Sequence, residues 1–359
     1  MSSKSSEERL RLIKENLAEV LNPEIITSIL DQERNPKIYW GTAPTGRPHC
    51  GYLVPAIKIA QFLAAGCEVT VLIANIHAML DNLKTTPELI HHRAEYYQFT
   101  VTSTLKACGV DTTKLRFVRG SSFQQRDDYI MDFYKLSTLV SEKACKKAGT
   151  EVVKQTSEAP LSAVMYPVLQ VLDEQYLDSD AQFGGVDQRK LFTAAIEWLP
   201  KLGYRKRAHL MNPMVPGLKG SKMSSSDENS KIDLLDSPDV VAKKIRKAEC
   251  VPKQVKENGV LALVEYVLLP ASALKTGVRE FKVERKDAEP RVYNDIETVH
   301  EDYSNDVLTP QMLKAAVIQG LLELIGPIQA EYQDSNEWQE AALKAYPPPV
   351  KKEKKVKKG

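Results

Sequence analysis

The stretch that most constrains the fold is a short apolar segment, followed by a turn rich in glycine, proline and threonine. Lys37–Trp40 is predicted to be a strand, Gly41–Tyr52 the turn, and Leu53–Leu63 the start of a helix. This order directs backbone N–H groups and a helix N-terminus toward a phosphate. The turn lacks the spacing of G-x-x-x-x-G-K-[ST] and of G-x-G-x-x-G. It carries Thr45 and His49, which can hydrogen-bond phosphate oxygens. A plain turn capped by a histidine is the alternative.

Runs rich in valine and isoleucine alternate with helical patterns along the first half of the chain. Strands are predicted at 37–41, 68–74 and 115–119, and helices at 51–65 and 87–107. Such runs are typical of a buried parallel sheet, whose ligands bind beyond the C-terminal ends of the strands. Tyr39, His77 and Gly184-Gly185 are expected at those ends. For His77 we prefer a structural role, with a hydrogen bond to a carbonyl.

At the N-terminus, Ser5 and Glu8 have the spacing of a capping box. Apolar residues at helical spacing predict that this helix continues as far as Leu21: Leu10, Ile13, Leu17, Val20 and Leu21. Asn22-Pro23 is expected to start a second helix. We assign both helices to packing, with no chemical role.

Two further stretches carry polar groups in a distinctive arrangement. Tyr166, Gln170 and Asp173 are spaced four and three residues apart, so they share one face of a helix. An exposed polar stripe is the alternative interpretation. Downstream, Gly220–Ser226 holds Lys222 among glycine and serine, which by itself is typical of a flexible linker.

Four motifs, taken in order along the chain, resemble the signatures of class I aminoacyl-tRNA synthetases. They are His49-Cys50-Gly51-Tyr52, Tyr166-x-x-x-Gln170-x-x-Asp173, Gly184-Gly185-Val186-Asp187-Gln188 and Lys222-Met223-Ser224-Ser225-Ser226. The first and the last are similar to the His-x-Gly-His and Lys-Met-Ser-Lys-Ser sequences of that class. The ordered set resembles tyrosyl-tRNA synthetases of the eukaryotic cytoplasmic type. The resemblance extends from about residue 8 to about residue 270.

The resemblance implies a reaction in two steps. Tyrosine and ATP give tyrosyl-adenylate and pyrophosphate, and the tyrosyl group then passes to tRNA(Tyr). ATP is a substrate and Mg²⁺ is expected to accompany it. Positioning and charge stabilisation carry such chemistry, without a protein nucleophile. The implied catalytic residues are Thr45, His49 and Lys222, with Lys222 closing over the phosphates on its mobile loop.

The resemblance also implies two sets of binding residues. The tyrosine-binding set is Tyr39, Tyr166, Gln170, Asp173 and Gln188. The ATP-binding set is Gly41, Thr45, His49, Tyr52, Gly185, Asp187, Lys222, Ser224 and Ser225. Within these sets, Tyr39 and Asp173 would face the substrate phenol and Asp187 would bind the ribose. Asp187 could also cap a helix, a role that is compatible with ribose binding.

Two positions depart from the class I pattern. Tyr52 stands in place of the second histidine of the first signature, and it can still donate one hydrogen bond. Ser225 stands in place of the second lysine of the last signature, which removes a cation. Mg²⁺ and Lys222 would therefore balance more of the phosphate charge.

A helical insertion is expected at about 125–165. Its lysines include Lys146, Lys147 and Lys154, and an ordinary solvated face is the simplest interpretation of such a cluster. In the resembled family this region packs across a homodimer and meets the acceptor end of tRNA. These three lysines are then candidates for phosphate contacts, which supply affinity and no sequence readout.

We divide the chain into three parts. Residues 1–230 are predicted to form the Rossmann-like α/β catalytic domain, and residues 231–346 a mainly helical anticodon-binding domain with a hairpin or irregular insert at 277–305. Residues 347–359 form a lysine-rich tail that we expect to be disordered. The tail holds a net charge of +5 against +2 for the whole chain, so it could bind a polyanion or act only as a solubilising end.

Composition excludes several classes of protein. No run approaches 18 consecutive apolar residues and the first residues are polar, so we expect neither a membrane span nor a secretory signal. The 5 cysteines contain no C-x-x-C pair, which predicts a cytoplasmic protein without disulfides or zinc. Two alternatives remain: a tryptophanyl-tRNA synthetase, and an RNA-binding relative without catalysis. The second has no need of His49 and Lys222.

Overall fold

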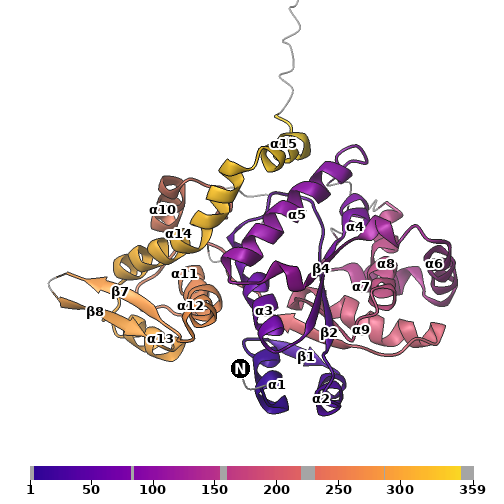
Figure 1. Cartoon of the computed structure of the whole chain (residues 1–359), viewed down its shortest axis with the longest axis horizontal. Helices are drawn as coiled ribbons and strands as arrows, with labels where there is room; N and C mark the ends of the chain where they lie inside the picture. The colour runs from indigo at the N-terminus through magenta and orange to yellow at the C-terminus, as the bar shows by residue number, and fades with distance from the viewer. Residues whose placement is uncertain (1–3, 82–84, 154–159, 220–230, 287, 349–359) are drawn as a thin grey trace, which may run out of the picture.

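The computed structural model describes residues 4–81, 85–153, 160–219, 231–286 and 288–348. A six-stranded sheet with helices on both faces adjoins a mainly helical region that carries a two-stranded hairpin (Figure 1). The strands of the large sheet, in spatial order, are β1 (Glu19–Leu21), β6 (Ala208–Asn212), β5 (Ala181–Gly185), β2 (Lys37–Thr42), β3 (Glu68–Ile73) and β4 (Leu115–Arg119). Neighbouring strands are parallel except β1, which pairs antiparallel with β6.

The direction of strand addition reverses beside β2. The chain adds β3 and then β4 on one side of β2, and later adds β5 and β6 on the other side. Such a reversal leaves a crevice beyond the C-terminal ends of the two strands that flank it, here β2 and β5. The predicted α/β fold is confirmed, and the three predicted strands match β2, β3 and β4 to within one residue.

Two hydrophobic clusters cover the two faces of the sheet. Tyr39 belongs to one cluster and Trp40 to the other, because successive side chains of a strand point to opposite faces. The helices of the Trp40 side are α3 (Leu53–Ala64) and α5 (Ile90–Ala107); those of the Tyr39 side are α6 (Asp127–Leu139), α7 (Glu142–Gly149), α8 (Ser162–Tyr176) and α9 (Arg189–Trp198). Short helix α4 (Asn75–Leu80) follows β3 directly.

The region after residue 230 packs around one long helix, α14 (Pro310–Asp334). The other elements are α10 (Pro238–Lys247), α11 (Gly259–Leu263), α12 (Leu269–Thr276), β7 (Phe281–Arg285), β8 (Ala288–Tyr293), α13 (Ile296–Ser304) and α15 (Asn336–Ala345). The hairpin expected within 277–305 is confirmed as β7 and β8, whereas α13 was not predicted. The hydrophobic core of this whole region is continuous with the Trp40 cluster. The domain limits themselves remain predictions.

Two helical segments of this region are long and apolar enough to cross a membrane by length and composition alone. They are Gly259–Thr276 and Pro310–Asp334. In the first, 61% of the apolar window is buried inside the protein, and both segments contribute side chains to the hydrophobic core. The corresponding window of the second is 33% buried. Packing in the core therefore accounts for the apolar character of the first segment and for the buried stripe of the second.

The prediction of a helix as far as Leu21 is wrong. Helix α1 (Ser6–Lys14) begins with the predicted capping box but ends before Asn16, whose φ is +57°. Residues 19–21 form β1, which pairs with β6, and helix α2 (Pro23–Asp31) follows. The backbone of Ala18 also donates to Met211 O at 2.8 Å. Pairing with a strand nearly 190 residues away therefore overrides the local helical pattern.

Candidate active site

The crevice beyond β2 and β5 opens into two adjoining chambers. One has a volume of about 360 Å³ and the other about 240 Å³. They share walls from the two strands and from the 3₁₀ turn Cys50–Tyr52 before α3: Trp40, Thr42, Tyr52, Phe183, Gly184 and Gly185. The site thus lies where the sheet topology and the sequence both place it.

The floor of the larger chamber carries two buried polar groups from different elements. Tyr39 comes from β2 and Asp173 from α8, and each side chain is about 1% exposed. Neither Tyr39 Oη nor Asp173 Oδ2 has a hydrogen-bond partner among the described residues. A buried polar atom without a partner costs about 1–3 kcal/mol. His77 Nε2, in the same chamber, has no hydrogen-bond partner among the described residues either. Unpartnered buried atoms gathered in one chamber are typical of a site where a ligand supplies the missing bonds.

The other carboxylate oxygen of Asp173 is held in place. Gln124 Nε2 donates to Oδ1 at 2.8 Å and Tyr129 Oη donates to it at 2.9 Å. Burial raises the pKa of Asp173 to about 7, against the lowering effect of these two bonds. Asp173 can therefore accept or donate a hydrogen bond near neutral pH.

The predicted hydrogen bond between His77 and a carbonyl is absent within the described part of the chain. His77 instead lines the same chamber. Its Nε2 lies 3.8 Å from Asp173 Oδ2, and its ring meets that of Tyr166 edge-on with centroids 4.6 Å apart. Burial lowers the pKa of His77 to about 3, so the imidazole is neutral. The prediction that it is buried is confirmed.

The wall above the floor is the predicted face of α8. Tyr166 and Gln170 line the chamber with Asp173, and Gln170 Nε2 donates to Gln188 Oε1 at 2.9 Å. Asp81, at the end of α4, also lines the chamber and is 7% exposed. Burial first, and then the charge of Asp81, raise the pKa of Tyr166. This wall combines amide and phenol groups with one carboxylate, a set suited to an ammonium group.

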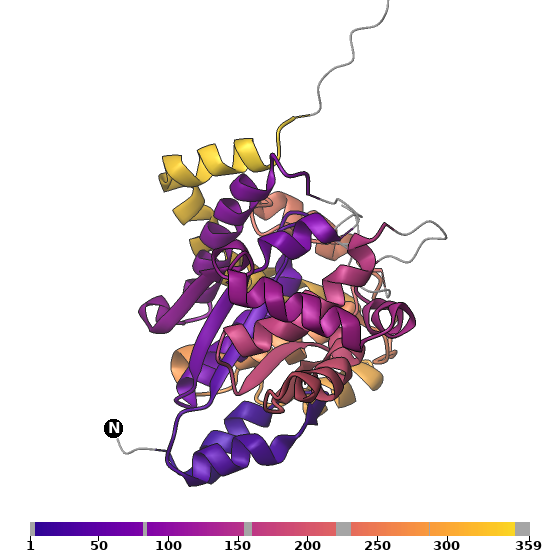
Figure 2. The same ribbon diagram turned by 90° about the vertical axis from the view of Figure 1, so that its right-hand side faces the viewer.

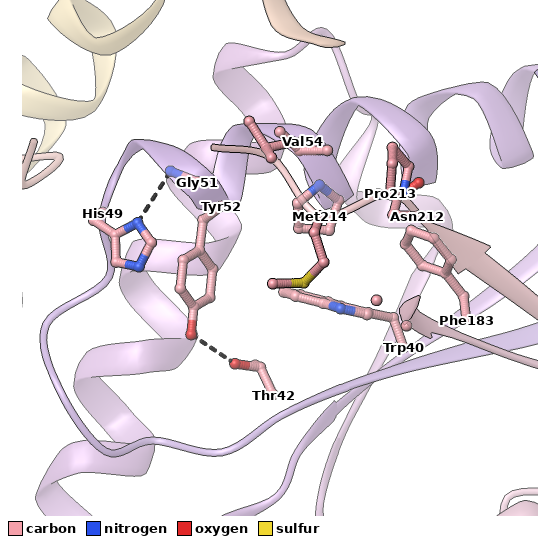
Figure 3. A pocket seen from close by; sticks show the side chains of 14 residues that line it. Trp40, Thr42, His49, Gly51, Tyr52, Val54, Phe183, Asn212, Pro213 and Met214 are labelled. Carbon is pink, nitrogen blue, oxygen red and sulfur yellow. Dashed lines mark hydrogen bonds between the residues drawn. The ribbon is translucent and has the colours of Figure 1, made fainter. Parts of the chain in front are cut away.

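The smaller chamber is lined by His49 and Tyr52 on one side and by the Trp40 ring on the other (Figure 3). His49 Nδ1 accepts a hydrogen bond from the backbone of Gly51 at 3.1 Å, and the Tyr52 and Thr42 hydroxyls lie 3.0 Å apart. Burial, with the nearby Lys231 charge, lowers the pKa of His49 to about 4. The neutral ring therefore carries its proton on Nε2, which is a donor.

The remaining predicted residues of the described chain line the larger chamber, and Gly185 lines both chambers. They are Gly41, Thr45, Gly185, Asp187 and Gln188. An added Cβ at Gly185 would approach Asp187 Oδ1 to 2.5 Å, so a glycine keeps that carboxylate in place. Asp187 lies in a short 3₁₀ turn, Val186–Gln188, before α9.

Lys222, Ser224 and Ser225 lie outside the described residues, but the segments on either side are anchored near His49 and α11. After the gap, the backbone of Cys50 donates to Ile232 O at 2.8 Å, and His49 pairs with Asp233. Before it, Glu249 N donates to Leu218 O at 2.7 Å. After this gap, the described chain therefore resumes beside His49.

The two predicted tRNA-binding lysines that the structure describes do not line the crevice. Lys146 and Lys147 are exposed on α7, and Lys146 Nζ lies 2.5 Å from Glu142 Oε1. Lys154 lies outside the described residues, as does the tail from residue 349. Among the residues that the structure describes, no group of three or more His, Cys, Asp or Glu side chains is placed to hold a metal ion.

Sequence reasoning missed several residues of the site. Gln124 and Tyr129 hold Asp173 from the segments that follow β4, and Asp81 follows α4. Pro213 and Met214 line the smaller chamber after β6. Asp81 could have been found, because a carboxylate shortly after a buried strand in this fold lies near the ligand crevice. The others carry no motif.

Comparison with known proteins agrees with this site. The sequence matches the family of tRNA synthetases class I (W and Y) over residues 31–325. It is 52% identical to the cytoplasmic tyrosine--tRNA ligase of Saccharomyces cerevisiae over 98% of this chain and 91% of the relative. It is 50% identical to that of Danio rerio, over 98% of this chain but only 66% of the longer relative. The structure of tyrosyl-tRNA synthetase from Archaeoglobus fulgidus with L-tyrosine has a TM-score of 0.84 and 34% identity, and covers 91% of this chain and 99% of that one.

The fold, the two-chambered crevice and these matches define a class I tRNA synthetase of the group specific for tryptophan and tyrosine, and the chain belongs to that family. Within it, the chain belongs to the tyrosine--tRNA ligases, as the sequence motifs predicted. The curated relatives named above are cytoplasmic enzymes, in agreement with the predicted location.

Proposed function

We propose that this chain activates tyrosine with ATP and transfers it to tRNA(Tyr), with the larger chamber holding the amino acid. The observation that carries this assignment is the pair of buried atoms without partners, Tyr39 Oη and Asp173 Oδ2. The phenol of tyrosine can donate to one and accept from the other. The indole of tryptophan has a donor only, so it would leave one of them without a bond.

The other end of the amino acid would lie against the wall of α8. Tyr166, Gln170 and Asp81 would surround its ammonium group, and Gln188 would lie toward its carboxylate. Gln170 already donates to Gln188, which fixes both amides before the substrate arrives. The carboxylate would then point toward the junction with the smaller chamber.

ATP would lie in the smaller chamber and across the junction. His49, with Nε2 as donor, and the hydroxyl of Thr45 would contact the phosphates, and Asp187 the ribose. A carboxylate oxygen of tyrosine attacks the α-phosphorus, and the bond from that phosphorus to the bridging oxygen of pyrophosphate breaks. Donors placed in advance stabilise the charge that grows on the leaving group.

Mg²⁺ would arrive with ATP and neutralise phosphate charge. The phosphates themselves and water are its usual ligands, so a separate cluster of protein carboxylates is not required. Lys222 would close over the same phosphates, because the described chain that follows its segment resumes beside His49. In the second step a ribose hydroxyl at the tRNA terminus attacks the acyl carbon, and AMP leaves.

A homodimer is supported by an exposed apolar surface on the insertion. Met131, Tyr134 and Leu139 on α6 and Leu161 before α8 are 53%, 58%, 45% and 73% exposed. A hollow of about 550 Å³ between α6, α7 and α8 lies beside them and is lined by Phe133, Val140 and Met165 among others. Apolar residues gathered in this way are typical of a protein interface. Lys146 and Lys147 would lie near this interface and contact tRNA phosphates.

Pyrophosphate exchange tests the assignment directly. We expect ATP–pyrophosphate exchange that depends on tyrosine and is absent with tryptophan or phenylalanine. Exchange with tryptophan would favour the tryptophanyl alternative, and no exchange with any amino acid would favour the RNA-binding relative. Lys222→Ala should slow the exchange on the order of 10²-fold with little change in tyrosine affinity, as expected for one lost charge donor.

A further inference from the structure

The last helix of the chain lies against the turn between β2 and α3. Helix α15 packs along α5, with the Trp338 and Phe99 rings stacked at a centroid distance of 6.0 Å (Figures 1 and 2). Trp338 is 1% exposed, so this docking is firm. The chain then runs through Ala345 and Tyr346 directly to the turn, although more than 290 residues separate them in sequence.

Arg93 and Tyr346 meet on one backbone carbonyl of the turn. Arg93 Nη1 donates to Thr45 O at 2.7 Å, and Tyr346 Oη donates to the same oxygen at 3.3 Å. Arg93 Nε also donates to Ala345 O at 3.2 Å. One guanidinium therefore ties the end of α15 to the turn that precedes His49.

Aromatic and cationic contacts add to these hydrogen bonds. The guanidinium carbons of Arg47 and Arg93 lie 5.0 Å and 4.9 Å from the centroid of the Tyr346 ring. The Tyr96 ring meets the Tyr346 ring edge-on at 5.3 Å. The two arginine contacts are attractive because a cation lies over the negative face of the ring. The ring of Tyr346 thus holds a side chain of the turn as well as its backbone.

The neighbouring carbonyls of the turn are also held from the side of α5. Thr85 Oγ1 donates to Pro44 O at 2.9 Å and is itself bonded by Arg93, while Tyr97 Oη donates to Gly46 O. Three consecutive carbonyls are thus fixed from outside the crevice. Fixing a carbonyl also fixes the orientation of its peptide plane, including the N–H on the other side.

We propose that Tyr346 and Arg93 are positioning residues for ATP: the docked end of the chain holds the turn that presents Thr45 and His49. This inference rests on the proposed function of the smaller chamber. Neither Tyr346 nor Arg93 lines either chamber. Tyr346 Oη contacts the backbone carbonyl oxygen of Thr45, so it acts on the turn from outside the crevice. Displacement of reacting groups by about 1 Å can lower a rate by as much as 10²-fold.

The test compares substitutions at Tyr346 in the full-length chain. Tyr346→Ala should lower kcat/KM for ATP in tyrosine-dependent exchange by about tenfold, while the Kd for tyrosine without ATP stays within about twofold. Tyr346→Phe should retain at least about half of the wild-type value, because the ring contacts and the Arg93 bond remain. Leu343→Ala is the matched control, because Leu343 lies on the exposed face of α15, just before Tyr346, and is 67% exposed.

A purely structural role would produce a different pattern. Tyr346→Leu keeps apolar volume while it removes the hydroxyl and the aromatic face, and it should match the alanine variant. The proposal is overturned if kcat/KM for ATP is unchanged in both Tyr346→Ala and Tyr346→Leu. It is also overturned if kcat/KM for ATP and the affinity for tyrosine fall equally, or if neither variant folds. If the wild-type chain shows no tyrosine-dependent exchange, the proposed function fails first, and that outcome is distinct.

Discussion

Asp173 and His77 lie side by side in the larger chamber, and burial acts on their pKa values in opposite directions. The pKa of Asp173 rises from 3.8 to about 7, so the folded protein binds more protons than the unfolded chain between these values. The free energy of unfolding therefore falls as pH rises through this window. The pKa of His77 falls from 6.5 to about 3, so there the unfolded chain binds more protons and the free energy of unfolding rises with pH.

The two effects oppose each other between about pH 4 and pH 6.5, and each substitution should expose the remaining one. We expect Asp173→Asn to make the stability increase more steeply with pH than in the wild type, and His77→Gln to make it increase less or decrease. Urea midpoints across this range measure both changes. Parallel pH profiles for the wild type and the two variants would show that neither group titrates as inferred.

The same carboxylate should decide which amino acid is used. In the proposed binding mode, phenylalanine would fill the larger chamber but leave Tyr39 Oη and Asp173 Oδ2 without partners, a loss of about 1–3 kcal/mol for each atom. Asp173→Ala should therefore reduce tyrosine use severely, and Tyr39→Phe less so, since Asp173 still binds the hydroxyl. The measurement is kcat/KM for tyrosine and phenylalanine in each variant. A ratio that stays at the wild-type value in both variants would locate hydroxyl recognition elsewhere.

At the scale of elements, the start of α11 supports the backbone that leads toward Lys222. An added Cβ at Gly259 would lie 2.3 Å from Gly217 O, a backbone atom that cannot swing aside. Gly259→Ala should therefore displace residues 216–218, lower the thermal midpoint and slow adenylate formation more than tyrosine binding. Gly277→Ala is a useful comparison: nothing lies within 4 Å of its Cβ and φ is +81°, so strain alone should act there. Equal kinetic losses in both would argue against a specific effect on this segment.

The elements that the sequence predicted well are those with a local pattern. Strands β2, β3 and β4 and helices α3, α5 and α8 follow from periodicity and from residues at their ends. Strands β1 and β6 were not predicted from the sequence. They pair with each other across a long separation in sequence, which no local pattern reveals. Helix α13 was missed for a related reason, since it packs beside the hairpin within a short segment expected to be irregular.

The residues of the site also separate into those that a local pattern predicts and those that it does not. Tyr166, Gln170 and Asp173 could be grouped from their spacing on one helix, and the structure brings them together in one chamber. Gln124 and Tyr129 come from a separate segment that only tertiary folding brings to Asp173. No local pattern marks a residue whose role is to hold another side chain.

At the scale of the whole molecule, the apolar surface of the insertion should control assembly. We expect Tyr134→Arg to shift the protein from dimer to monomer, because an arginine at a buried interface position leaves a charge without a partner. Lys143→Ala, on the exposed part of α7, is the control and should leave the dimer intact. Sedimentation velocity at several concentrations distinguishes the two. A dimer that persists in the first variant would place the interface on another surface.

The docked end of the chain has a practical consequence for labelling and immobilisation. A fluorophore or affinity tag joined directly after Pro348 would start close to Arg47 and Thr45, beside the turn that we propose to hold ATP. The N-terminal helix lies at the opposite end of the view in Figure 1. A label attached before Ser5 should therefore stay away from the proposed nucleotide site. A label attached after Pro348 should instead respond to changes in the turn between β2 and α3.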